Sequence, residues 1–201
     1  MWRTKNTNMK ASIVTILMLL TTAFSTKAQD SARRHKLLPD HLKVQFAGGI
    51  GFLSVGAGYS NKKDKLEGDL WYGYVPKGVG GVEIHSASVK LTWHPVKKKE
   101  WRSYEMRPLS VGVLVSYTFG KQYFLFSPKN YPYSYYNFPT ALHGGGFIGG
   151  RIDKKLKGSK KLGIYYELGT NDRELVSYAS NPGALSPLDI VNLAIGAKLT
   201  L

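Results

Sequence analysis

Side chains that could take part in nucleophilic catalysis lie close together in one segment, at His85, Ser86 and Ser88. A catalytic serine needs a neighbouring base, and that base must itself be held in place. If the segment is a β-strand, adjacent residues point to opposite faces, so His85 points away from both serines. The spacing argues against a catalytic pair within this segment and leaves His85 as a candidate only in combination with a distant residue.

Metal-binding chemistry has little support in the sequence. The chain has five histidines and no cysteine, and the histidines are not spaced as ligands on one face. His85 and His94, for example, fall on opposite faces of a strand. We therefore expect no metal site and no cofactor. The lack of cysteine also excludes a disulfide framework in a secreted chain.

The elements that must position these residues show a two-residue alternation, which is clearest in the last thirteen residues, 189–201. One face of that segment is apolar, with Val191, Leu193, Ile195, Ala197, Leu199 and Leu201. The same alternation occurs in the segments 66–74, 86–94, 109–119 and 162–169, and less regularly in 141–152. Repeated strands of about ten residues with one apolar face are typical of a transmembrane β-barrel, which turns that face toward lipid.

The number of strands depends on the segment 43–60. Val44 and Phe46 occupy even positions, whereas the apolar residues Leu53 and Val55 occupy odd ones. A continuous strand cannot change parity without a bulge, so either a bulge or a tight turn lies at Gly48–Gly51. Bacterial single-chain barrels have even numbers of strands. We therefore favour the turn, which gives an all-β fold: an antiparallel transmembrane β-barrel of about eight strands with a short N-terminal extension.

The opposite faces of these strands predict an interior polar network. Its members are Glu67, Asp69, Lys90, His143, Arg151, Glu167, Asn192 and Lys198. Three of them are acidic and three are basic, and pairing limits the high cost of buried charge. Because a barrel of eight strands is filled by side chains, the balance favours a closed interior over a narrow channel. A soluble sandwich would place these charges in water, where no balance is needed.

The N-terminus has the organisation of a secretory signal peptide. Basic residues precede an apolar run at 11–24, and Thr26-Lys27-Ala28 supplies small residues before a cleavage site. The run is short for a transmembrane helix. We predict a signal peptide at 1–28, an N-terminal periplasmic segment at 29–42 and a barrel domain at 43–201 in the outer membrane of a Gram-negative bacterium.

The net charge and the connections suggest partners. A formal net charge of +15 fits anionic outer-membrane lipid and lipopolysaccharide, since an exported chain rarely meets nucleic acid. The predicted extracellular connections are 76–81, 121–140 and 171–187, and the basic connections 61–65, 96–107 and 153–161 lie at the other end. The aromatic loop residues are Tyr131, Tyr133, Tyr135, Tyr136 and Phe138. They could form an interface girdle and pack the loop, or contact a glycan or a protein.

Four segments carry a family resemblance: Lys27–Gln29, Gly51–Gly56, Trp71–Pro76 and Gly80–His85. They resemble segments of uncharacterised small outer-membrane β-barrel proteins of Bacteroidota. The resemblance covers nearly the whole mature chain. It implies a fold and a location and leaves the activity open.

A second resemblance concerns Ser180-Asn181, which is followed by Gly183 and Leu185. This pair is similar to part of the His-x-Ser-Asn motif that lipid A deacylase barrels carry before their final strand. The resemblance implies Ser180 as nucleophile, with Asp189 as an acidic partner. Tyr178 replaces the motif's histidine, so the base is missing. We therefore expect a structural or surface-interaction role without a catalytic site, with a lipid-modifying esterase or a narrow channel as alternatives.

Overall fold

The computed structural model describes residues 38–124 and 140–201. The predicted signal peptide and the aromatic loop residues between 131 and 138 lie outside these residues. Pro39–Leu201 form one compact unit. Within the described residues, no helix combines the length and the apolar character that a membrane span requires.

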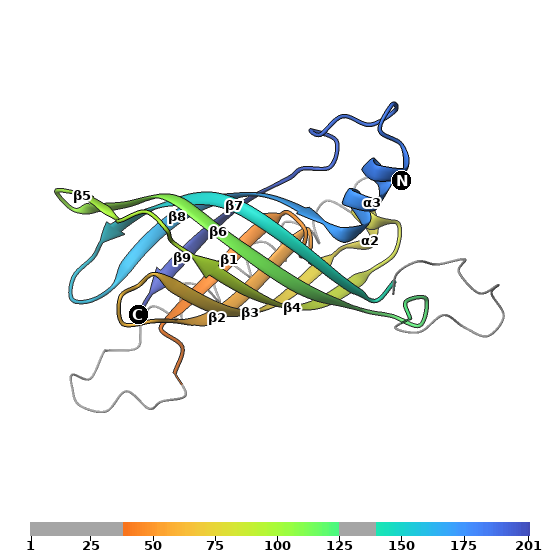
Figure 1. Cartoon of the computed structure of the whole chain (residues 1–201). Helices are drawn as coiled ribbons and strands as arrows, with labels where there is room; N and C mark the ends of the chain where they lie inside the picture. The colour runs from red at the N-terminus through yellow and green to blue at the C-terminus, as the bar shows by residue number, and fades with distance from the viewer. Residues whose placement is uncertain (1–37, 125–139) are drawn as a thin grey trace, which may run out of the picture. The chain divides into compact units, whose positions relative to one another are not determined.

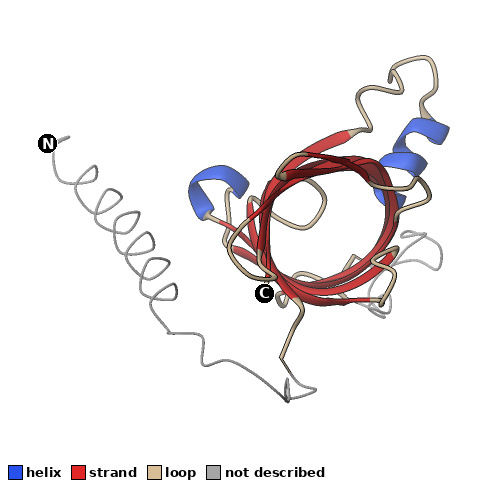
Figure 2. Cartoon of the chain, turned by 90° about the vertical axis from the view of Figure 1, so that its left-hand side faces the viewer, coloured by secondary structure: helices blue, strands red, loops and turns tan. Residues whose placement is uncertain are grey.

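The fold is a closed antiparallel β-barrel (Figures 1 and 2). Its eight strands are β1 (His41–Ala47), β2 (Leu53–Ser60), β3 (Leu66–Val75), β4 (Ile84–Trp93), β6 (Tyr104–Phe119), β7 (Leu142–Lys155), β8 (Lys161–Asn171) and β9 (Asn192–Thr200). Neighbours in this order pair with each other, and β1 also pairs with β9, which leaves no free edge. The structure confirms the predicted all-β, antiparallel barrel of eight strands.

A tight turn, and no bulge, explains the change of parity between β1 and β2. Ala47 and Gly48 both have positive φ angles, of 60° and 82°. The backbone N–H of Ala47 donates to the carbonyl of Phe52 across the turn at 2.9 Å. The glycine supplies the left-handed conformation that most side chains disfavour. Val44 then pairs with Val55, so the even apolar positions of β1 and the odd ones of β2 share the outer face.

β6 begins five residues before the segment predicted from Leu109. A bulge between Arg107 and Ser110 makes Pro108 and Leu109 lie opposite the single residue Gly150 of β7. Pro108 has no N–H to donate to the ladder, which fits a bulge. The bulge changes the parity of the strand, so the segment before it did not match the pattern after it. Arg107 is buried in the barrel as a result.

Two expected connections are partly strand. The short strand β5 (Lys99–Trp101) pairs with Tyr104–Met106 of β6, and β7 continues to Lys155 before the turn at 156–160. We call β5, residues 104–107 of β6 and residues 152–155 of β7 the tongue, which projects at the end of the barrel that holds Leu201 (Figure 1). The predicted connections 96–107 and 153–161 were therefore too long.

Two short helices lie at the other end of the barrel, in connections predicted as loops. These are α2 (Lys77–Gly80) and α3 (Asp172–Ser180). Asn171 caps α3: its side chain accepts from the backbone N–H of Glu174, whose side chain in turn accepts from the Asn171 N–H. This reciprocal capping box satisfies two helix N–H groups and begins the helix where β8 ends.

The distribution of side chains is the reverse of that in a water-soluble domain. Among the described residues, eighteen polar or charged residues are buried and only seven apolar ones are. Apolar side chains cover the outside instead, as at Val113 and Ile164, which are 59% and 67% exposed. The barrel thus has a charged core and an apolar outer surface.

Candidate functional site

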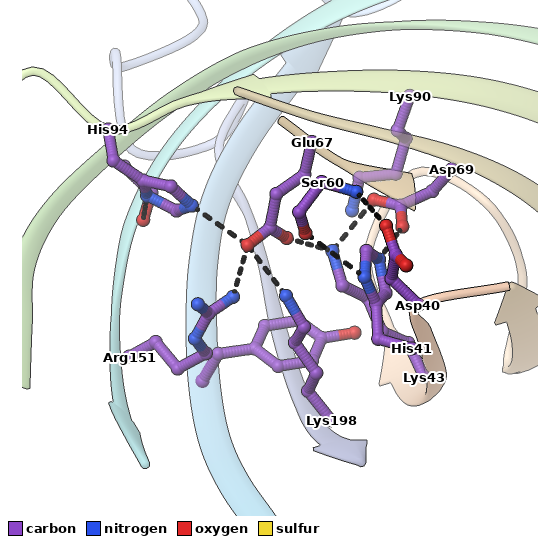
Figure 3. A network of polar contacts seen from close by, with 12 residues as sticks. Asp40, His41, Lys43, Ser60, Glu67, Asp69, Lys90, His94, Arg151 and Lys198 are labelled. Carbon is purple, nitrogen blue, oxygen red and sulfur yellow. Dashed lines mark hydrogen bonds and ion pairs between the residues drawn. The ribbon is translucent and has the colours of Figure 1, made fainter. Parts of the chain in front are cut away.

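The polar interior centres on Glu67 of β3, which is fully buried (Figure 3). Its Oε1 accepts from Lys198 Nζ at 2.6 Å and from Arg151 NH1 at 2.8 Å. His94 Nε2 lies 3.1 Å from the same oxygen. Lys43 Nζ donates to the other oxygen, Oε2, at 2.8 Å. One carboxylate thereby binds three basic side chains, from β1, β7 and β9, and the histidine that follows β4.

Asp69, two residues along β3, forms the second acidic centre. Alternation places it on the same inner face as Glu67. Lys43 Nζ donates to Asp69 Oδ2 at 2.7 Å and so bridges the two carboxylates. His41 Nε2 lies 2.5 Å from Asp69 Oδ1, and its Nδ1 lies 3.3 Å from the Ser60 hydroxyl. The His41 ring is held at both nitrogens.

A third group surrounds Lys90 of β4. Its Nζ donates to Glu167 Oε2 at 2.5 Å and to Gln45 Oε1 at 3.2 Å. The ammonium also lies 5.0 Å from the ring centroid of Trp71 and 4.5 Å from that of Phe147. Both distances are in the range of cation–π attraction, which stabilises a desolvated ammonium. The positive charge of Lys90 is therefore stabilised by a carboxylate, an amide oxygen and two aromatic rings.

The formal charges of this interior cluster are balanced. Four basic side chains, Lys43, Lys90, Arg151 and Lys198, lie with four acidic ones, Glu67, Asp69, Asp153 and Glu167. Balance and direct pairing are what a low-dielectric interior requires, since an unpaired ion there costs several kcal/mol. The network can hold six of the eight strands in register, and each of its charged side chains pairs with another member of the network.

Large aromatic side chains fill the remaining volume, and each lies over a glycine on the neighbouring strand. Trp71 lies over Gly56, Phe147 over Gly112, and Tyr165 over Gly196. A Cβ at Gly112 would lie 2.2 Å from Phe147 Cζ. The two inner cavities near the network are about 20 Å³ each, which is room for about one water molecule. The interior is therefore closed by packing as well as by ion pairing.

The structure brings together six of the eight residues predicted for the interior network: Glu67, Asp69, Lys90, Arg151, Glu167 and Lys198. The other two, His143 and Asn192, lie at the α3 end of the barrel. His143 Nδ1 is 3.1 Å from Asp172 Oδ1, and Asn192 Nδ2 donates to Glu174 Oε1 at 2.5 Å. They tie the first turn of α3 to the barrel wall.

Further members of the network were missed in the sequence analysis. Lys43, His41 and Gln45 alternate with the outward Val44 and Phe46, so the parity of β1 carried a signal for them. Three other buried residues had no such signal. Glu105 and Arg107 precede the bulge in β6, and Asp153 lies in the part of β7 that was predicted as a connection. Arg107 forms an ion pair with Asp64.

The residues considered for catalysis are not assembled into a site. Ser180 is exposed at the end of α3, which packs against β7 and β8, whereas His85 lies on β4 and contacts the Tyr72 hydroxyl at 2.6 Å. Asp189 Oδ2 accepts from the backbone N–H of Ser186. In residues 38–124 and 140–201, no hydrogen bond joins Ser180 to a histidine or a carboxylate.

One cluster has the composition of a metal site. His41, Glu67 and Asp69 bring potential ligand atoms within 4.8 Å of one another. However, the Lys43 ammonium bonds to both carboxylates, at 2.8 and 2.7 Å, and supplies the positive charge there. His41 is already bonded to Asp69. The donor set fits a resident lysine better than a divalent cation, because an added cation would meet the repulsion of Lys43.

No family model, curated protein or solved structure matches the chain. Function is accordingly inferred from the fold and from the chemistry of its two surfaces, the charged interior and the apolar exterior.

Proposed function

We propose that the protein is an outer-membrane β-barrel of a Gram-negative bacterium, with its apolar outer face in lipid, and that it has a structural or surface-interaction role. The observation that carries the proposal is the reversed distribution of side chains, with a paired charge network inside and an apolar belt outside. The apolar belt suits lipid and is unfavourable in water, and the pairing of the interior charges is what a filled, closed barrel requires.

The apolar belt runs around the barrel and is not confined to one patch. Val44 on β1, Leu70 on β3 and Val89 on β4 are 40%, 65% and 53% exposed. Ile164 and Ile195 continue the belt on β8 and β9. Exposed apolar surface in water costs about 25 cal/mol per Å². Monomeric soluble proteins rarely expose continuous apolar patches above a few hundred Å², which favours lipid as the outer solvent.

The unequal ends of the barrel suggest its orientation. The end that holds Leu201 and the start of β1 has short turns at 61–65 and 156–160 and the tongue, and the other end has α2, α3 and the long connections. Bacterial outer-membrane barrels have short periplasmic turns and longer extracellular loops. We therefore propose that the tongue lies at the periplasm and that α3 faces the outside.

The proposed surface role rests on the outer connections. Exposed apolar residues such as Leu175 on α3 and Leu188 after it are available for contact there, at 49% and 82% exposed. Lipopolysaccharide, a glycan or a protein is the proposed partner of this end, and outer-membrane lipid is the partner of the belt.

Membrane fractionation combined with gel mobility tests the proposal. We expect the full-length chain to be exported, to co-purify with the outer membrane and to migrate faster on gels when it is not boiled. External protease should cut the long connections and spare the strands. Recovery as a soluble periplasmic monomer would refute the proposal.

A further inference from the structure

The outer surface of the described barrel is hollowed next to the β6 bulge. A groove of about 730 Å³ follows β6, β7, β8 and β9. Gly150 lines the groove between the carbonyls of Arg107 and Pro108 and the ring of Tyr166, and it has no side chain that would extend into the space. The apolar residues Met106, Ile152 and Ile164 line the groove toward the tongue. The volume is in the range of pockets that hold one ligand molecule.

Strand register shows what lies at the tongue end of this groove. Tyr104 pairs with Lys154, and Lys154 pairs with Leu162, so these residues form one outward row across β6, β7 and β8. The same row continues through Trp101, which pairs with Tyr104. Lys99 pairs with Met106 and joins the neighbouring row. Lys154 and Tyr104 therefore line the groove at this end, and Lys99 and Trp101 lie beside it on the neighbouring strand β5.

The lysines in the tongue and next to it, at Lys98 and at the start of β8, differ in their partners according to the face of the sheet that they occupy. On the inner face, Lys98, Lys155 and Lys161 all form ion pairs with Glu100 or Glu105. On the outer face, Lys99 and Lys154 have no acidic partner within the described part of the chain. Both acidic residues thus neutralise the inner lysines, and the positive charge next to the groove is left for an external anion.

From this juxtaposition we propose that the groove binds one anionic phospholipid of the periplasmic leaflet. An acyl chain lies over Gly150 between Met106, Ile152 and Ile164, and the phosphate is bound by Lys154 and Lys99. Trp101 and Tyr104 lie at headgroup level, where amphipathic rings are favoured. The inference rests on the proposed function, because it requires the apolar belt to be in lipid. A glycerophospholipid fits this site because its apolar acyl chain matches the apolar floor of the groove. Its phosphate matches the two lysines, which have no acidic partner among the described residues.

Native mass spectrometry of the folded barrel tests the headgroup contact. The barrel is released from neutral detergent and titrated with palmitoyl-oleoyl phosphatidylglycerol or with the corresponding phosphatidylcholine. We expect one phosphatidylglycerol to be retained in preference to phosphatidylcholine. The double variant K99Q/K154Q should lose about 30-fold in affinity for phosphatidylglycerol, about fivefold for each lysine, with little change for phosphatidylcholine.

The matched control is K62Q/K63Q, which removes two exposed lysines from the turn between β2 and β3 at the same end of the barrel. It should retain the wild-type preference. Wild-type affinity in K99Q/K154Q, an equal loss in the control, or no preference in the wild type would each overturn the site.

A second pair of variants tests the apolar groove. Ile164→Trp should fill the groove and weaken the binding of both lipids. Ile148 lies on the outer face of β7 and does not line the groove, so Ile148→Trp should leave binding unchanged. Equal binding by the two variants would contradict the acyl site. Failure of the proposed function has a different signature, since the wild-type barrel would then not insert into lipid vesicles. If the barrel inserts but shows no preference for phosphatidylglycerol, the result contradicts the proposed lipid site and leaves the proposed function standing.

Discussion

Glu67 is the residue on which the charged interior depends most. Its two oxygens accept from Lys43, Arg151 and Lys198, and the three lie on three different strands, β1, β7 and β9. Because the carboxylate is fully buried, water cannot replace it as a partner for these cations. Loss of its charge would leave an excess of positive charge in a low-dielectric space.

We expect Glu67→Gln to destabilise the barrel by about 3–5 kcal/mol, the usual cost of removing one partner of a buried ion pair. Urea unfolding of the protein refolded into detergent or vesicles measures this cost. Glu83→Gln is the control, because Glu83 is exposed and accepts only from the Tyr74 hydroxyl in the described structure. Equal stability of the two variants would contradict a structural role for the network.

Gly112 tests the packing of aromatic rings over glycines. A Cβ there would lie 2.2 Å from Phe147 Cζ and 2.6 Å from the carbonyl oxygen of Leu91. We expect Gly112→Val to destabilise the barrel by about 1–3 kcal/mol through overpacking. Gly68→Val is the matched control on β3, since its Cβ would meet only Leu91 Cδ2 at an ordinary 3.6 Å. The same urea measurement compares the two variants, and a larger effect at Gly68 would refute this packing.

Among the elements, the tongue is the part whose stability depends most directly on surface charge. Glu100 accepts from Lys155 at 2.9 Å and lies 2.9 Å from Lys98. The contact with Lys155 joins β5 to β7, although β6 lies between them in the sheet, whereas Lys98 directly precedes β5. Both contacts are exposed, so each contributes modestly and is screened by salt.

The tongue should therefore respond to acid. Hydrogen bonds from Lys155 and Lys98 lower the pKa of Glu100 from 4.5 to about 2. Because the folded pKa lies below the unfolded one, the contribution of Glu100 is complete above about pH 4.5 and is lost as the pH falls toward 2. Carbon-13 NMR of the Glu100 carboxyl in micelles should show this low midpoint.

Two variants test the cause of the low Glu100 pKa. Lys155→Gln should raise the midpoint toward 4.5, and Lys62→Gln, in the turn between β2 and β3, should leave it unchanged. A wild-type midpoint near 4 would show that the lysines do not hold the carboxylate.

For the whole molecule, closure is the property that limits what the barrel can do. An eight-stranded barrel is narrow enough for side chains to fill it. Here paired charges and the rings of Trp71, Phe147 and Tyr165 occupy the lumen, and its inner cavities hold about one water molecule each.

We therefore expect no stable conductance steps when the purified protein is reconstituted in planar bilayers. A porin inserted under the same conditions serves as the positive control. Trp71→Ala combined with Phe147→Ala enlarges the lumen next to Lys90 and is the variant in which small conductance steps should first occur. Regular steps from the wild-type barrel would contradict a closed interior and favour a channel.

The sequence by itself indicated the eight barrel strands, because alternation with a period of two is a local property of each segment, but it did not indicate β5 or the start of β6. The change of parity located a turn or a bulge at Gly48–Gly51. The even number of strands in bacterial barrels, which is not a local property, favoured the turn. The sequence also placed Glu67 and Lys198 on inner faces. It could not identify Arg107 as an interior residue, because the bulge at Pro108 interrupts the local pattern on which that reasoning depends.

Only the tertiary structure decided which charges pair and which remain free. Lys198 and Glu67 are 131 residues apart and meet because barrel closure sets β1 between β9 and β2. The contrast between paired Lys155 and free Lys154 likewise depends on the register of β5, β6 and β7. Whether a side chain points into or out of the barrel follows from its own position in the alternation. Which charged side chains pair depends on the stagger of the strands around the closed barrel, and no single segment contains that information.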